Sequence, residues 1–185
     1  MHPLLTTTTL AILLLPLLIT SSPLKTTTCT SDSLNNFTWT LSNFSFNADY
    51  MFTTPAHQNS WGYTSFNLYN PVVFSNITCS AQSNQLNDFF YGTIPYTCSD
   101  NGSTKFTFNR PTGEIKINQS WTCDLDRQYP IVFSGSGGVN LTLECEESNW
   151  VNPNWTIGQT YSQRNVDCEQ VGEVQIGLSE LSAVS

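Results

Sequence analysis

The sequence predicts an all-β protein, a compact antiparallel β-barrel or sandwich of about eight to eleven short strands stapled by disulfides. Short segments alternate apolar and polar residues with a period of two, and turn residues separate them at short intervals. No segment shows the apolar period of a convincing amphipathic helix. Six cysteines follow the N-terminal segment, and an even number in an exported chain indicates disulfide bonds.

The chain begins with the pattern of a secretory signal peptide. Residues 10–19 are almost entirely aliphatic, residues 20–22 are small and polar, and no acidic residue precedes Asp32. We therefore expect residues 1–22 to be the signal and the mature protein to be secreted into the extracellular space. The alternative, a membrane anchor, would need about 20 apolar residues, and Pro16 interrupts a run that is shorter than this.

The chain beyond the signal fits a single domain. We expect a flexible, Thr-rich spacer over residues 23–35 and one β-barrel domain over residues 36–185. The net charge of −8 and the lack of clustered Lys and Arg disfavour nucleic acid as a partner. An acidic surface rich in Thr, Ser and Asn is typical of extracellular solubility, and no second long apolar run predicts contact with a membrane.

The first strand is expected in two parts. Residues 37–41 and 44–46 both alternate, but the inward parity reverses between them, and a β-bulge at residues 42–43 would explain the reversal. Residues 53–62 lack any period and predict a loop. The residues of the first part that share one face are Phe37, Trp39 and Leu41.

The strongest single prediction is a hairpin formed by residues 105–109, a turn at residues 110–113 and a second arm at residues 114–121. Pro111 presets φ near about −65° for the second turn position, and Gly113 suits the last one. Alternation on both arms then defines a shared inner face. Its predicted members are Phe106, Phe108, Ile115, Ile117 and Trp121.

Further strands are expected before and after this hairpin. Upstream, two runs flank the break at Asn70–Pro71 and suit an antiparallel pair. Downstream, the glycine-rich segment 135–138 separates two runs, and a last alternating run lies near the C-terminus. These strand candidates are residues 65–69, 72–79, 130–133, 139–145 and 171–181.

Residues 146–165 break the alternation and predict a loop that carries Trp150 and Trp155. Two tryptophans in a loop could form a stacking platform for a sugar or an aromatic ligand, so both are weak candidates for a binding site. The alternative, which we favour, is that they plug the end of the barrel or cover a gap in its core.

A catalytic site has little support. His57 is the one histidine beyond the signal, and no G-x-S-x-G turn accompanies it, so no catalytic residue is assigned. Asp124, Asp126, Glu144 and Glu147 are available for a glycosidase pair, but sequence spacing alone does not establish their separation. Asp124 and Asp126 lack the rest of a calcium loop, and the cysteines lack a zinc-binding CxxC pair. We expect no metal and no cofactor.

Glycosylation is compatible with export. The sequence contains seven N-x-S/T sequons, each an acceptor pattern for an N-linked glycan in a secreted protein. The expectation is a glycoprotein in which some of these sites are occupied. The candidate acceptors are Asn36, Asn43, Asn76, Asn101, Asn118, Asn140 and Asn154.

Four short segments resemble the Alternaria major-allergen family of secreted fungal proteins. Their order and spacing carry the resemblance, and the surrounding region, residues 77–121, carries it best. The likeness implies an antiparallel β-barrel, commonly dimeric, without an established enzymatic activity. The segments are Ile77-Thr-Cys-Ser-Ala-Gln82, Leu86-Asn-Asp88, Tyr96-Thr-Cys98 and Phe106-Thr-Phe108.

The same resemblance implies disulfide pairs. Cys79 should pair with Cys98, and Cys145 should pair with Cys168. Cys29 corresponds to the N-terminal cysteine that can link two protomers in the family. Cys123 has no counterpart there and could capture Cys29 within one chain, which is the pairing that we expect; a Cys29-linked homodimer is the alternative.

The resemblance also ranks the possible functions. Family members elicit plant defence, bind host pathogenesis-related proteins, and in some cases bind small phenolic ligands. A secreted effector or elicitor, allergen-like and acting by binding a host protein or a phenolic ligand, is therefore expected first. A carbohydrate-binding or wall-associated β-module is the alternative, and a small secreted hydrolase ranks last.

Overall fold

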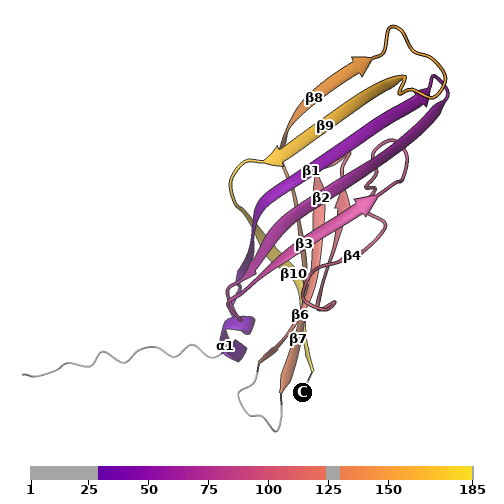
Figure 1. Ribbon diagram of the computed structural model, residues 1–185. Coiled ribbons are helices and arrows are strands. Elements are labelled where there is room, and N and C mark those ends of the chain that lie inside the picture. Colours follow the sequence, from indigo (N-terminus) through magenta and orange to yellow (C-terminus); the bar gives the residue numbers. More distant parts are fainter. Residues whose placement is uncertain (1–28, 124–129, 185) are drawn as a thin grey trace, which may run out of the picture.

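In the described part of the chain, ten antiparallel strands and one short helix form a nearly closed β-barrel with an extension at one end (Figure 1). The computed structural model describes residues 29–123 and 130–184. The predicted all-β, disulfide-stapled fold is confirmed. The elements are α1 (Cys29–Leu34), β1 (Thr38–Thr54), β2 (His57–Asn70), β3 (Ser75–Ser83), β4 (Tyr96–Thr97), β5 (Thr104–Asn109), β6 (Glu114–Cys123), β7 (Ile131–Asn140), β8 (Leu143–Val151), β9 (Ser162–Gln170) and β10 (Val174–Val184).

The barrel follows the strand order β3-β2-β1-β10-β7-β6-β5-β4. The two ends of this order meet, because the Ser99 amide donates a 3.0 Å hydrogen bond to the Thr78 carbonyl, and a disulfide joins Cys79 on β3 to Cys98 just after β4. These contacts close most of the seam and leave few unpaired barrel edges.

Strand β1 belongs to two parts of the molecule. Its first residues pair with β10, from Thr38 opposite Gly177, whereas its later residues pair with β9, up to Phe52 opposite Ser162. The change occurs at a register shift between Ser42 and Ser45, where Asn43 has a φ of 54°. The predicted bulge is confirmed, and it is where the sheet branches.

The branch directs β9 and β8 beyond the barrel body (Figure 1). We refer to β8, β9 and the connecting residues 152–161 as the wing. β8 pairs with β9 alone, and β9 pairs with both β8 and β1. The wing is therefore held to the barrel through β1 along one edge and is open along the other.

The barrel interior is aromatic. Among the residues predicted to face inward, Phe37 is partly buried, and its ring packs edge-on against Trp39 and Trp121 at centroid distances of 5.9 and 5.5 Å. The other predicted inward residues are buried, which confirms the alternation: Trp39, Leu41, Phe106, Phe108, Ile115, Ile117 and Trp121.

The β5–β6 hairpin forms as predicted, with Asn109 opposite Glu114 across a four-residue turn. The amide of Gly113 bonds the Arg110 carbonyl at 3.3 Å, and its φ is +70°. A Cβ at Gly113 would lie 2.5 Å from the Leu141 carbonyl oxygen, so the turn needs glycine for both its conformation and its close approach to Leu141.

Two predicted loops are wrong. Residues 53–62 lie mostly in β1 and β2, with only Pro55 and Ala56 between the strands, and residues 146–165 contain the end of β8 and the start of β9. All of β8 except Leu143 is exposed, and such a strand has no buried face to impose alternation. The loop in this region is limited to residues 152–161.

Two predicted strand boundaries also change. Residues 72–74 belong to the turn before β3, and the glycine-rich residues 135–138 lie inside β7 instead of separating two strands. A Cβ at Gly137 would lie 2.3 Å from the Gly177 carbonyl oxygen and 3.1 Å from the Trp39 ring. Glycine therefore lets β10 and a buried indole approach this strand closely.

The six cysteines form the three expected pairs, two of which the family resemblance implied, and the third of which joins Cys29 to the cysteine without a family counterpart. They are Cys29–Cys123, Cys79–Cys98 and Cys145–Cys168, all within one chain. The first bridge fixes α1, whose buried Ser33 also accepts a 2.9 Å hydrogen bond from the Trp121 indole nitrogen. Residues 29–34, which were expected in a flexible spacer, are therefore a helix attached to the barrel.

Candidate functional site

A hollow of about 430 Å³ lies between the inner face of the wing and the β5–β6 turn. The turn brings a charged side chain to the hollow, and the wing contributes Leu143 and a disulfide, with Leu141 just before the wing. Its volume falls within the range of small-molecule sites. The lining residues are Asp88, Arg110, Pro111, Thr112, Gly113, Leu141, Leu143, Cys145 and Cys168.

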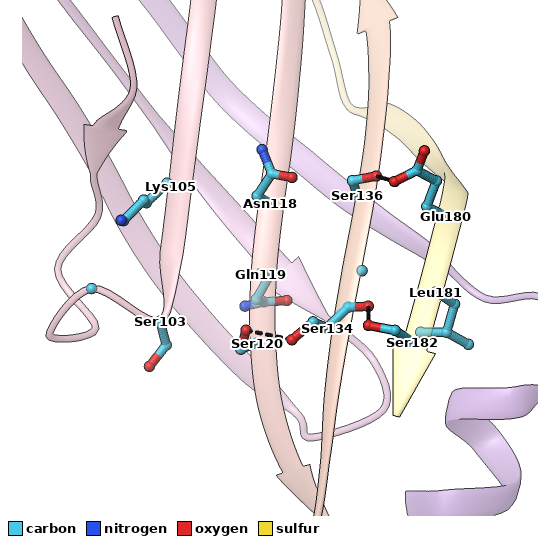
Figure 2. A pocket seen from close by; sticks show the side chains of 12 residues that line it. Ser103, Lys105, Asn118, Gln119, Ser120, Ser134, Ser136, Glu180, Leu181 and Ser182 are labelled. Carbon is cyan, nitrogen blue, oxygen red and sulfur yellow. Dashed lines mark hydrogen bonds between the residues drawn. The ribbon is translucent and has the colours of Figure 1, made fainter. Parts of the chain in front are cut away.

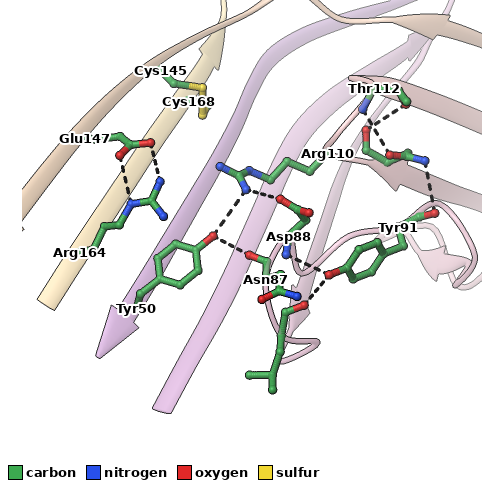
Figure 3. Close-up of polar contacts among 12 residues, drawn as sticks. Tyr50, Asn87, Asp88, Tyr91, Arg110, Thr112, Cys145, Glu147, Arg164 and Cys168 are labelled. Atoms are coloured by element: carbon green, nitrogen blue, oxygen red, sulfur yellow. Dashed lines mark hydrogen bonds and ion pairs between the residues drawn. A yellow bond between two sulfur atoms is a disulfide. The ribbon is translucent and has the colours of Figure 1, made fainter. Parts of the chain in front are cut away.

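Arg110 is the cation of this hollow (Figure 3). Its side chain is 19 % exposed, its Nη1 donates a 2.8 Å hydrogen bond to Asp88 Oδ1, and its guanidinium lies 4.9 Å from the centre of the Phe46 ring. Nη1 also lies 3.5 Å from the Tyr50 hydroxyl, which in turn donates to the Asn87 carbonyl at 2.7 Å. These contacts hold the guanidinium in one orientation.

A second ion pair lies on the inner face of the wing (Figure 3). Arg164 bonds Glu147 through two contacts of 2.7 and 3.1 Å, and its guanidinium lies 5.0 Å from the centre of the Tyr50 ring. The hydrogen bond from Arg164 lowers the pKa of Glu147, and the same bond raises the pKa of Arg164. Glu147 is therefore ionised at neutral pH and is poorly suited to donate a proton as a glycosidase acid.

A second hollow, of about 480 Å³, runs over β5, β6, β7 and β10 and is rich in serine hydroxyls (Figure 2). The Ser120 and Ser134 hydroxyls bond each other at 2.8 Å, and Ser136 donates to Glu180 at 3.4 Å. Among the described residues no histidine lines this hollow, so these hydroxyls have no adjacent histidine there to activate a serine nucleophile.

The residues considered for catalysis do not form a common site within the described chain. His57 is exposed, and its Nδ1 lies 2.9 Å from the Thr53 hydroxyl. Glu144 and Glu147 lie on opposite faces of β8, because three positions separate them on a strand. The described residues contain no group of three side chains placed to hold a metal ion. Asp124 and Asp126 lie outside the described residues.

The structure separates the two candidate tryptophans. Trp150 lies on β8, not in a loop, and is 51 % exposed. Trp155 lies in the wing loop, where its indole nitrogen donates to the Gln159 carbonyl at 2.8 Å and its ring packs edge-on against Tyr161. Neither belongs to the buried core. The exposed Trp150 side chain is thus accessible to a partner, whereas the Trp155 side chain makes contacts that stabilise the wing loop.

All seven sequon asparagines are exposed, so the fold leaves each of them accessible to a glycan. They lie on several strands and turns of the barrel and, for Asn154, in the wing loop. The predicted signal, residues 1–22, lies outside the described residues. Within the part of the chain that is described, no helix has the length and apolar character to cross a membrane.

Comparison with known proteins gives one family and two related structures. The family model described as Alternaria alternata allergen 1 matches residues 41–168. A crystal structure of Alternaria alternata allergen Alt a 1 has 18% identity and a TM-score of 0.45, covering 77% of this chain and 88% of that one. A crystal structure of the Alternaria alternata major allergen Alt a 1 has 19% identity and a TM-score of 0.41, covering 77% and 92%. No curated protein sequence gives a significant match.

The fold, the three bridges and the polar hollow beneath the wing define a disulfide-stapled β-barrel protein. The family match covers well over half of the chain. The chain belongs to the Alternaria alternata allergen 1 family, as the residues around Cys79 and Cys98 predicted.

Proposed function

We propose that this chain is a secreted fungal protein that acts by binding a host extracellular protein, and that the wing is its contact surface. The observation that carries the proposal is the exposure of β8, on which every residue after Leu143 is exposed. A strand that contributes so little to the core adds little to the stability of the fold, so its presence suggests another role. Exposed apolar side chains on the wing, Trp150, Val151 and Ile157, provide the kind of anchors that dominate protein interfaces.

Export is supported by the disulfides as well as by the predicted signal. Three bridges persist in oxidising compartments and are rare in the cytosol. The exposed sequons are compatible with the same route. An allergen-like effector or elicitor needs a stable surface and no turnover, and the three bridges supply that stability.

A small phenolic ligand in the hollow beneath the wing is a second candidate function. Its support is specific: Arg110 offers a fixed cation to a phenolate oxygen, and Leu141, Leu143 and a disulfide offer apolar walls to an aromatic ring. Titrating the protein with a flavonol and with its fully methylated ether tests it. Binding of the flavonol that is lost with the ether and with Arg110→Met supports this site; equal binding by Arg110→Met counts against it.

Host binding is tested by retaining proteins from plant extracellular fluid on the immobilised full chain and identifying those that soluble chain competes away. Trp150→Ala should abolish specific retention, because the side chain lies at the exposed wing. The matched control is Phe74→Ala, since Phe74 is 80 % exposed in the β2–β3 turn, at the end of β2 away from the wing. Retention that resists Trp150→Ala but is lost with Phe74→Ala would move the contact surface to the other end of the barrel.

The same experiment separates the alternatives. A wall polysaccharide that is retained through Trp150 in place of any protein would indicate a carbohydrate-binding module, since sugars stack on exposed aromatic rings. Multiple-turnover hydrolysis of a polysaccharide or peptide that is abolished by His57→Ala or Glu144→Gln, with the fold retained, would indicate a hydrolase.

A further inference from the structure

The open edge of β8 carries unpaired backbone groups that could hydrogen-bond to another strand. β8 pairs with β9 alone and forms the outer edge of the wing (Figure 1). Its nine residues are long for an edge strand, and all except Leu143 are exposed. Natural proteins shorten, cover or charge such edges because their free backbone groups pair with other chains. Within the described residues this edge is neither short nor covered, and of the three devices it uses only charge, on its three glutamates.

The geometry identifies which backbone groups the open edge presents. Cys145 lies directly opposite Cys168, and their Cα atoms are 4.0 Å apart. This short spacing marks a pair that exchanges no backbone hydrogen bonds. The amides and carbonyls of Cys145, Glu147 and Asn149 therefore point away from β9, toward the open edge, while the side chains of Glu144 and Glu146 point to the outer face.

The outer face beside this edge is acidic. Glu144 lies directly opposite Glu169, and Glu146 lies directly opposite Asp167, so two pairs of like charges face each other across β8 and β9. The next strand adds Asn47, whose amide donates to Asp167 at 2.6 Å, but no positive charge. Like charges at opposite positions destabilise a sheet, and the described ion pairs leave all four carboxylates without a cation.

The cations of the described residues lie elsewhere. Arg164 is the single Lys or Arg in β1, β2, β3, β8 and β9, and it faces the opposite side of the wing, against Glu147 and Tyr50. Lys105 and Lys116 lie on β5 and β6. A second copy of this chain at the β8 edge would bring the same carboxylates against each other, so the charge pattern disfavours self-pairing.

We propose that the β8 edge receives an extended, basic segment of the partner protein as an added strand, with Lys or Arg at alternate positions beside Glu144 and Glu146. Backbone hydrogen bonds from Cys145, Glu147 and Asn149 hold the segment, and the carboxylates select its sequence. An apolar residue of the segment meets Trp150 on the same outer face. The proposal rests on the proposed function and names the partner chemistry at the same surface.

The test uses the full chain and blocked peptides of about nine residues, the length of β8. One peptide alternates lysine with threonine, a second has the same composition with its lysines in one block, and a third replaces lysine with glutamate. Two further versions of the first peptide carry N-methyl groups on every lysine or on every threonine. Each methylated set removes the backbone donors on one edge of the added strand and leaves the other edge intact.

We expect the alternating peptide to bind and to slow hydrogen exchange at the amides of Cys145, Glu147 and Asn149. The block and glutamate peptides should bind at least about tenfold more weakly. One methylated peptide should lose binding and the other should retain it, because only one edge of the added strand pairs with β8. Equal binding by both methylated peptides, or slowed exchange elsewhere with β8 unchanged, overturns the proposal.

Variants of the protein test the role of the two carboxylates independently of the peptide series. The double change Glu144→Gln and Glu146→Gln should weaken the alternating peptide about tenfold, whereas the matched change Glu180→Gln, on β10 of the barrel, should not. If host protein is retained through Trp150 but neither the peptide nor the double change affects retention, this inference fails and the proposed function stands. If no host protein is retained while the peptide protects β8, the proposed function fails and the edge-strand site stands.

Discussion

The indole nitrogen of Trp39 donates a 2.8 Å hydrogen bond to the side-chain oxygen of Gln119 inside the barrel. The Asn70 side chain donates to the same oxygen at 2.8 Å, so one buried acceptor satisfies two donors from β1 and β2. All three side chains are buried. An aromatic core with an indole nitrogen in its interior needs such an acceptor, and β6 supplies it at the one polar position between Ile117 and Trp121 on its inner face.

Replacing this acceptor should destabilise the barrel strongly. Gln119→Leu leaves two buried donors without a partner, each costing about 1–3 kcal/mol, so we expect the free energy of unfolding to fall by about 2–6 kcal/mol. Chemical denaturation measures it. The control is Thr122→Ala on the same strand, which is exposed and should change stability by less than about 0.5 kcal/mol. A Gln119→Leu protein as stable as the wild type would show that the two donors find other partners.

Removing the wing disulfide should act locally. Cys145 and Cys168 are separated by 23 positions, and Cys79 and Cys98 by 19. Because the two loops are similar in length, each bridge should stabilise the folded state by about 3 kcal/mol through its constraint on the unfolded chain. We expect Cys145→Ala with Cys168→Ala to speed hydrogen exchange in β8 and β9. The matched pair Cys79→Ala with Cys98→Ala should destabilise the barrel seam instead. The same exchange pattern in both variants would contradict a separate role for the wing bridge.

The two wing tryptophans should differ in what their loss affects. Trp155→Ala removes a ring contact with Tyr161 and a hydrogen bond to Gln159, so we expect a loss of about 1–2 kcal/mol in stability. Trp150→Ala removes an exposed side chain, and stability should stay within about 0.5 kcal/mol while partner binding falls. Thermal unfolding and the retention assay measure the two effects. A sharp fall in stability for Trp150→Ala would assign that ring to packing.

The Glu147–Arg164 pair should make the wing sensitive to acid. Arg164 lowers the pKa of Glu147 below its ordinary value of 4.5 in the folded chain. A carboxyl whose folded pKa is depressed stabilises the fold above its unfolded pKa, and this contribution is lost as the pH falls through the folded pKa. We therefore expect Glu147→Gln to unfold at a lower temperature than the wild type at neutral pH, and the difference to vanish in acid.

Carbon-13 chemical shifts of the Glu147 carboxyl, followed through a pH titration, measure the shift directly. Arg164→Met removes the hydrogen bond that is its main cause, so the midpoint should return toward the ordinary value. An unchanged midpoint in Arg164→Met would mean that the ion pair does not form in solution.

The amino-acid sequence by itself determined the parts of this protein in which one face of a strand is buried. Trp39, Phe106 and Ile115 alternate with polar neighbours because a pleated strand turns successive side chains to opposite faces, and the turn at Pro111–Gly113 follows from local backbone preferences. The family, too, could be predicted from short segments around Cys79 and Cys98.

The tertiary structure alone decided the wing and its surroundings. β8 is exposed on both faces, so no alternation of apolar and polar residues marks it in the sequence. The glycines of β7 are explained only by the structure, in which Gly137 lies against Gly177 and Trp39. The acidic outer face depends on pairing: Glu146 and Asp167 are far apart in sequence, and only the register of β8 on β9 places them opposite each other. Register and strand order are set by long-range packing, which the local pattern of residues does not encode.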